Sequence, residues 1–257
     1  MEENKKVLVT GTVVVVLVVL VVIVVYLLIS NRSKKISEEQ IIGDQGVILE
    51  RKDVPLEENM EPLDIRLDES DEAIRNLARE LSDHCAVMKW LLSKDLIRKF
   101  TAAVDNIAHG QSPRPHINFF ETEEKFQVIQ KNGVYYIDPE SYKRYDIISD
   151  AFDSLDARKC VGLYRRLKPL IQKAYAELGY PDSDFDQTLD RAIQELLKVP
   201  VLEMDIELKK QVLSYEIADA ELEGMSEAQK HLFRMGPENV WKIKSKLREI
   251  LRQLGSR

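Results

Sequence analysis

Polar residues that stand among aromatic ones are the first candidates for recognition chemistry in this chain. Asp105 and Asn106 lie near the end of one predicted helix, and residues 144–146 follow a predicted β-hairpin. Tyrosine and arginine are enriched at binding hot spots, so this pattern predicts a groove that binds a partner. The candidate partner-binding residues are Arg98, Asp105, Asn106, Tyr142, Arg144, Tyr145, Asp146, Arg165 and Tyr180. The alternative is that they belong to the core and to internal salt bridges, because tyrosine is often half-buried with a bonded hydroxyl.

Paired carboxylates are the second chemistry that the sequence offers. Asp105 together with Asp146 or Glu177 would suit an envelope hydrolase, if the two carboxylates lie about 5–10 Å apart in an open cleft. The chain has no glycine-rich phosphate loop, no Gly-x-Ser-x-Gly elbow and no His-Glu-x-x-His motif. We therefore expect no catalytic residues and a protein that is not an enzyme, with the hydrolase as the alternative.

The sequence predicts neither a metal site nor a cofactor. Residues 182–190 resemble the start of a calcium loop, but Gln187 and Ile193 stand where such a loop needs glycine and glutamate. His109 and His116 have no further ligands at a metal-binding spacing. Cys85 and Cys160 fall on apolar helical faces, which predicts two buried thiols, with one disulfide as the alternative in an oxidising compartment.

The elements that must position these residues are mostly helices. Apolar residues recur at helical spacing from residue 70 onward. Asn132-Gly133 lies between two apolar runs, which is the strongest short signal for a β-hairpin. Pro169 should kink or divide the long helix in which it falls. The predicted helices are 91–107 with Ser93 as its cap, 155–178, 184–197, 226–235 and 237–254, and the segment 207–217 is ambiguous.

Residues 7–29 form an almost unbroken apolar run without a charged residue. Roughly 20 apolar residues in a helix span the hydrocarbon core of a bilayer. No Ala-x-Ala cleavage pattern follows the run, so we expect an uncleaved single-pass transmembrane helix. Residues 1–6 are then a short tail, residues 30–69 an acidic flexible spacer, and residues 70–257 a mostly helical globular domain.

Charge leaves the orientation in the membrane open but limits the partners. Arg32, Lys34 and Lys35 after the run slightly favour a cytoplasmic domain, whereas an uncleaved N-terminal segment commonly acts as a signal-anchor. The net charge is −7, and the acids and lysines of residues 1–29 cancel, so the rest of the chain carries all of it. An acidic domain argues against nucleic acid as a partner.

Several motifs follow one another in an order that resembles a known family. They are RKFTAAVDNIAHG (98–110), DPESYKRYD (138–146), LYRRLKP (163–169), AYAELGYP (174–181), LEGMSEAQK (222–230) and RMGPEN (234–239). Over about residues 70–254 the chain resembles the bacterial domain of unknown function family number 3014. The resemblance implies an envelope protein with an N-terminal membrane segment and a domain outside the inner membrane. It implies no activity.

We therefore expect a mainly α protein: a helical domain with one small β-hairpin, preceded by a single transmembrane helix. The leading hypothesis is a non-enzymatic binding or scaffold domain in the bacterial inner membrane, facing the periplasm, with a protein or cell-wall partner. The alternatives are the envelope hydrolase and a scaffold that faces the cytoplasm.

Overall fold

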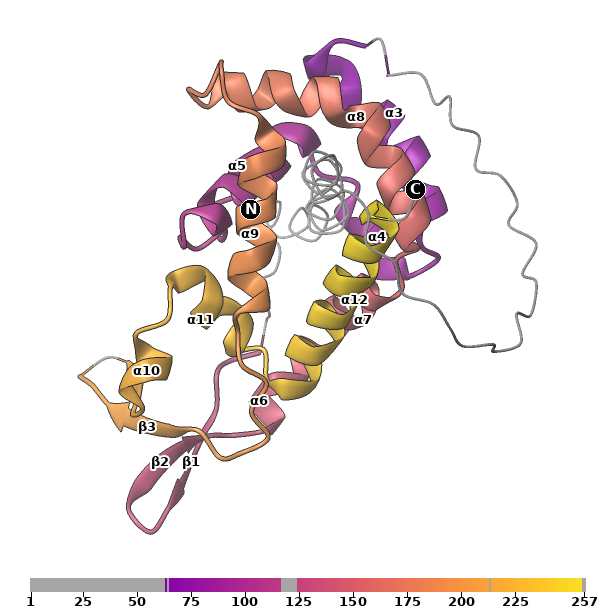
Figure 1. Cartoon of the computed structure of the whole chain (residues 1–257). Coiled ribbons are helices and arrows are strands. Elements are labelled where there is room, and N and C mark those ends of the chain that lie inside the picture. Colours follow the sequence, from indigo (N-terminus) through magenta and orange to yellow (C-terminus); the bar gives the residue numbers. More distant parts are fainter. Residues whose placement is uncertain (1–62, 64, 117–123, 213, 256–257) are drawn as a thin grey trace, which may run out of the picture.

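The computed structural model describes residues 63, 65–116, 124–212 and 214–255, and this part of the chain is mainly helical, as the sequence predicts (Figure 1). The helices are η2 (Leu67–Glu69), α3 (Ser70–Ala78), η3 (Arg79–Leu81), α4 (Cys85–Trp90), α5 (Leu96–Ala108), α6 (Glu140–Lys143), α7 (Asp146–Asp153), α8 (Ala157–Glu177), α9 (Phe185–Leu197), α10 (Ala220–Glu223), α11 (Glu227–Phe233) and α12 (Pro237–Gly255). The strands are β1 (Val128–Lys131), β2 (Val134–Ile137), β3 (Glu207–Lys210) and β4 (Tyr215–Ile217). The sheet lies at the end of the molecule opposite α3 and α8 (Figure 1).

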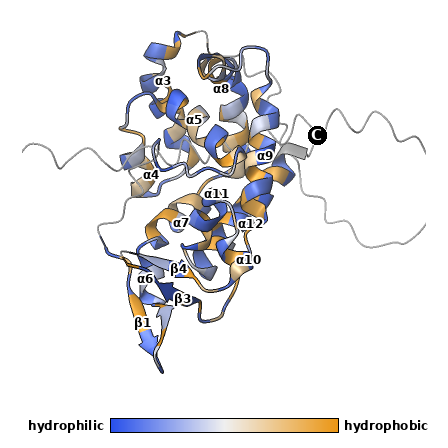
Figure 2. Cartoon of the chain, turned by 90° about the vertical axis from the view of Figure 1, so that its left-hand side faces the viewer, coloured by the Kyte–Doolittle hydropathy of each residue, from blue (hydrophilic) through white to orange (hydrophobic). Residues whose placement is uncertain are grey.

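The helices bury one face each in a shared core. α5 packs against α8 and α9, while α12 packs against α7 and α8. Hydrophobic and hydrophilic residues alternate around the same helices, which is the pattern of amphipathic helices on a core (Figure 2). Large aromatic side chains fill the centre, and the rings of Phe100 and Phe185 meet edge to face at 5.6 Å.

Two buried tyrosines join α8 to α9 through polar contacts. The Tyr164 hydroxyl donates to an Asp186 carboxylate oxygen at 2.5 Å, and Lys168 donates to the other oxygen at 2.5 Å. The Tyr175 hydroxyl shares a 2.7 Å hydrogen bond with Thr188. Because these buried polar groups are paired, they hold the two helices in one register instead of destabilising the core.

The ends of the helices follow the sequence in some places and not in others. The predicted helix 184–197 is confirmed as α9, which Asp184 caps, and α8 runs through Pro169 as one helix that changes direction partway along its length (Figure 1). The predicted helix 91–107 begins later, at Leu96, and Ser93 is not its cap. Its first backbone N–H groups donate instead to the carboxylate of Asp71 on α3.

The prediction of a single β-hairpin is wrong. β1 and β2 form the expected hairpin around Asn132-Gly133, whose φ angles are +51° and +84°. The ambiguous segment 207–217 supplies a second hairpin, β3 and β4, and the described sheet is antiparallel with the order β1-β2-β3-β4. A lone hairpin is marginally stable, so pairing Tyr135 with Leu208 gives both hairpins a shared surface.

The two cysteines differ in burial. Cys160 is buried, and burial raises the pKa of its thiol, but Cys85 is exposed, so the prediction of two buried thiols is wrong for Cys85. Cys85 opens α4, whose buried face carries Ala86, Val87 and Trp90 instead. Both thiols are free.

Within the described ranges no helix combines the length and apolarity needed to cross a bilayer, and residues 7–29 lie outside those ranges.

Candidate functional site: a groove beside the sheet

The predicted partner-binding residues fall in separate places, and Arg98 is engaged in internal ion pairs. Its guanidinium bonds to both oxygens of Glu177 at 2.6 and 3.0 Å and to Asp68 at 2.7 Å. These contacts tie α5 to the end of α8 and to η2. Arg165 is exposed on α8. The alternative reading of internal salt bridges therefore describes Arg98.

Asp105 lies on α5, which packs against α9, and the charge of Arg191 on α9 acts on it. Its side chain is 16% exposed, and its Oδ1 atom is buried without a hydrogen-bond partner among the described residues. Burial raises the pKa of Asp105, and the nearby His109, Arg191 and His116 lower it only in part. His109 Nδ1 lies 3.4 Å from this oxygen and bonds to the backbone carbonyl of Asp105 at 2.8 Å.

Asn106 and Tyr180 make internal structural contacts. Asn106 donates to the carbonyl of Ser112 at 3.2 Å, which closes the loop after α5. The ring of Tyr180 stacks on that of Tyr175 at 4.7 Å and covers the end of α8. Neither side chain lines the groove described below.

The residues 142–146 pack against α12. The guanidinium of Arg144 lies over the rings of Tyr145 at 4.7 Å and Phe126 at 5.4 Å. Asn239 of α12 donates to the Asp146 carboxylate at 3.1 Å and to the Tyr142 carbonyl at 3.2 Å. These residues join α12 to the segment before α7. The partner of the Asp146 carboxylate is Asn239 of α12, whereas Asp105 lies on α5.

The carboxylates of the hydrolase alternative are thus held in three different settings. Glu177 is paired with Arg98, Asp146 is paired with Asn239, and Asp105 lies on α5 near His109 and Arg191. None of the three lines the groove beside the sheet.

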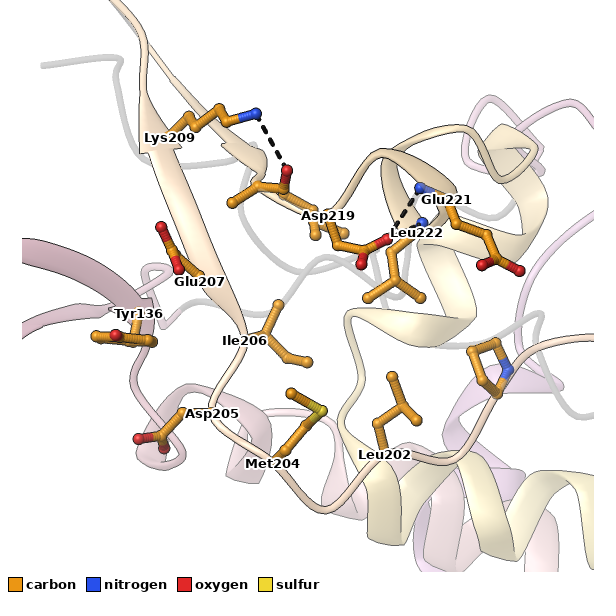
Figure 3. A pocket seen from close by; sticks show the side chains of 13 residues that line it. Tyr136, Leu202, Met204, Asp205, Ile206, Glu207, Lys209, Asp219, Glu221 and Leu222 are labelled. Atoms are coloured by element: carbon orange, nitrogen blue, oxygen red, sulfur yellow. Dashed lines mark hydrogen bonds between the residues drawn. The ribbon is translucent and has the colours of Figure 1, made fainter.

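A pocket of about 810 Å³ lies beside the sheet, bounded by the loop 200–206, by β2, β3 and β4, and by the start of α10 (Figure 3). We call it the sheet groove. Its apolar lining consists of Pro200, Leu202, Met204, Ile206, Ile217 and Leu222. Figure 3 shows Leu202, Met204, Ile206 and Leu222 approaching one another from the loop and from α10. Binding sites commonly combine such an apolar floor with a few polar groups.

Local sequence explains the shape of the loop. Pro200 cannot continue α9, and the buried Lys244 amine of α12 donates to the carbonyl of Val199 just before it. At the other end of the loop the carbonyl of Ile206 accepts from the N–H of Ile137 at 3.0 Å. Both ends are fixed, so the extended chain between them presents Leu202 and Met204 to the groove.

Hydrogen bonds also fix the start of α10. The Asp219 carboxylate caps this helix, accepting from the N–H groups of Glu221 at 2.9 Å and Leu222 at 3.0 Å. Glu223 accepts from the N–H of Ile217 at 2.8 Å and pairs with Lys230 at 3.0 Å. Burial raises the pKa of Glu223, but the contacts with Ile217 and Lys230 lower it more. The Glu223 carboxylate is therefore ionised, and it links the end of β4 to α11.

The residues of the sheet groove were not among the predicted site residues, although the amino-acid sequence contains a pattern that indicates three of them. Leu202, Met204 and Ile206 alternate with polar residues, which is the spacing of one face of an extended chain. In the structure Met204 is 66% exposed. The other apolar residues of the floor, Ile217 and Leu222, come from β4 and α10. Their packing against this loop is a tertiary contact, which the local sequence does not predict.

The fold and its sites define a class of protein: a mainly helical domain with a small antiparallel sheet and a partly apolar groove. The chain belongs to the family described as "Protein of unknown function (DUF3014)", which matches residues 96–251. The matched span begins with α5 and contains the sheet groove and all the candidate partner-binding residues. No curated protein and no solved structure matches the chain.

Proposed function

We propose that this chain is a single-pass membrane protein of the bacterial envelope whose described domain binds a partner protein in the sheet groove, without catalysing a reaction. The observation that carries the proposal is the groove itself: a pocket of about 810 Å³ whose floor includes an exposed methionine. Methionine adapts to differently shaped apolar partners and is common at binding surfaces. No cluster of metal-ligating residues is found among the described residues.

The location rests on residues 7–29 and on the family. The apolar run has the length and composition of a bilayer span, which supports an anchor. The resemblance to a bacterial envelope family supports a domain on the outer side of the inner membrane. The basic residues after the run, Arg32, Lys34 and Lys35, favour the opposite orientation, so a cytoplasmic-facing scaffold is the outcome to be tested against.

Site-specific photo-crosslinking in cells that produce the full chain tests the binding role. With p-benzoyl-phenylalanine in place of Met204, we expect irradiation to give a discrete protein adduct. Val212 is a matched control, because it is 95% exposed on the hairpin of β3 and β4 but does not line the groove. The proposal fails if the Met204 position gives no adduct, or if both positions give the same adducts.

A further inference from the structure

We infer that the sheet groove takes a segment of the partner protein with an apolar centre and lysine or arginine residues beside it. This inference rests on the proposed function and adds the chemistry of the ligand. It starts from the floor, where Leu202, Met204 and Leu222 converge without a side chain of the described residues covering Met204. An apolar side chain that enters here removes Met204 from water, which favours binding.

The charges around the floor favour a cation. Carboxylates outnumber amines in the lining, with Asp205, Glu207, Asp219 and Glu221 against Lys209. The Lys209 amine is turned toward the carbonyl of Ala218, to which it donates at 3.1 Å, and so leaves the acids of the lining without an amine from this residue (Figure 3).

The four carboxylates are not equivalent. Asp205 is paired with Lys131 at 2.5 Å, and Asp219 is used in capping α10. Within the described part of the chain, Glu207 and Glu221 have neither a hydrogen-bond nor an ion-pair partner for their carboxylates. Glu207 pairs across the sheet with Tyr136, and both residues line the groove, with the Glu207 carboxylate on the other side of β3 from Ile206 (Figure 3). Unpaired carboxylates in the lining of the groove favour a basic side chain on the partner and disfavour an anionic ligand.

Three synthetic peptides with the same Leu-Phe-Leu centre test this chemistry on the purified full chain in detergent. Their flanks are lysine, serine or glutamate, and binding is followed by fluorescence anisotropy. We expect the lysine peptide to bind about fivefold more tightly than the serine peptide, the glutamate peptide to bind most weakly, and the lysine preference to shrink as salt is added.

Matched substitutions assign the effect to the groove. Glu207→Gln should remove part of the lysine preference and the double substitution Glu207→Gln/Glu221→Gln most of it, while Glu203→Gln, on the same loop but outside the lining, should leave it unchanged. Met204→Ser should weaken the lysine and serine peptides alike, and Val212→Ser should weaken neither. Both controls and Met204 are exposed, so these changes should not unfold the domain.

The two proposals can fail separately. Equal binding of the lysine and glutamate peptides, or a lysine preference that survives the double substitution Glu207→Gln/Glu221→Gln, would overturn the inferred chemistry while the adduct at Met204 still supported a binding role. Absence of the adduct together with absence of peptide binding would overturn both.

Discussion

Asp105 is a carboxylate whose setting costs the folded state free energy. Its Oδ1 atom is buried and has no hydrogen-bond partner in the described part of the chain, and burial raises its pKa. A carboxyl with a raised folded-state pKa favours the fold while it is protonated, at low pH, and that contribution is lost as the pH rises through the folded pKa. At neutral pH the ionised group is therefore less stable in the folded protein than in the unfolded chain.

Asp105→Asn should consequently raise the free energy of unfolding at pH 7 by on the order of 1 kcal/mol, measured by urea denaturation. The gain should disappear near pH 3, where the wild-type carboxyl is protonated in both states. Asp95→Asn, at a position whose side chain is 60% exposed, is the control and should change little. A loss of stability in Asp105→Asn would mean that the carboxylate has a stabilising partner in the fold.

His231 on α11 links stability to acid. Burial lowers its pKa from 6.5 to about 4, and the positive charges of Arg114 and Arg234 add to the shift. A group with a depressed folded-state pKa binds a proton more readily in the unfolded chain, so stability is lost as the pH falls from 6.5 toward 4.

His231→Gln should make the free energy of unfolding less sensitive to pH over this range. The wild type should lose on the order of 3 kcal/mol more than the variant between pH 7 and pH 4. Urea denaturation at several pH values measures the difference, with His109→Gln, whose side chain is 44% exposed, as the control. Parallel pH profiles for wild type and His231→Gln would contradict the assignment.

At the scale of elements, the start of α5 depends on a residue far away in the sequence. The carboxylate of Asp71 accepts from the N–H groups of Asp95 and Leu96, each at 2.9 Å. Such a cap satisfies backbone donors that the helix itself leaves open.

Asp71→Ala should therefore lower the free energy of unfolding by about 1–2 kcal/mol. Glu72→Ala changes the neighbouring exposed residue of α3 and should cost much less. Thermal or urea denaturation of both variants is the measurement. Equal effects would show that the loss comes from the charge of the first turn of α3 and not from capping α5.

The junction between α11 and α12 depends on a glycine. Gly236 has a φ of +87°, and a Cβ atom there would overlap the ring of Tyr142. Gly179 also has a positive φ, +105°, but a Cβ atom there would meet no atom of the residues that the structure describes within 4 Å.

Gly236→Ala should cost about 2–5 kcal/mol, because backbone strain and overpacking add, whereas Gly179→Ala should cost only the strain, about 1–2 kcal/mol. Comparing the two variants by denaturation isolates the contact with Tyr142. Similar losses at both positions would mean that α6 moves away at little cost.

These elements also show what a sequence can and cannot reveal. The hairpin around Asn132-Gly133 and the helix predicted over 184–197 have local signals, and both are confirmed. β3 was ambiguous because only Leu208 of its residues is buried, so its identity depends on pairing with β2. The candidate partner-binding residues failed to converge for the same reason: Asn239, Glu177 and Tyr175, which hold several of them, come from distant helices.

At the scale of the whole molecule, the proposed function combines a binding groove with a membrane anchor. The sheet groove lies at the end of the domain opposite α3, the helix that follows the predicted spacer (Figure 1). With the proposed anchor joined to the chain before α3, the groove would lie at the end of the domain away from this attachment point.

The proposed function requires that residues 7–29 hold the domain outside the inner membrane. Fusions of alkaline phosphatase and of green fluorescent protein after Arg257 test it directly, because the first is active only outside and the second fluoresces only inside. We expect phosphatase activity without fluorescence, in the membrane fraction. Fluorescence without phosphatase activity would contradict the envelope location and direct the search for the partner to the cytoplasm.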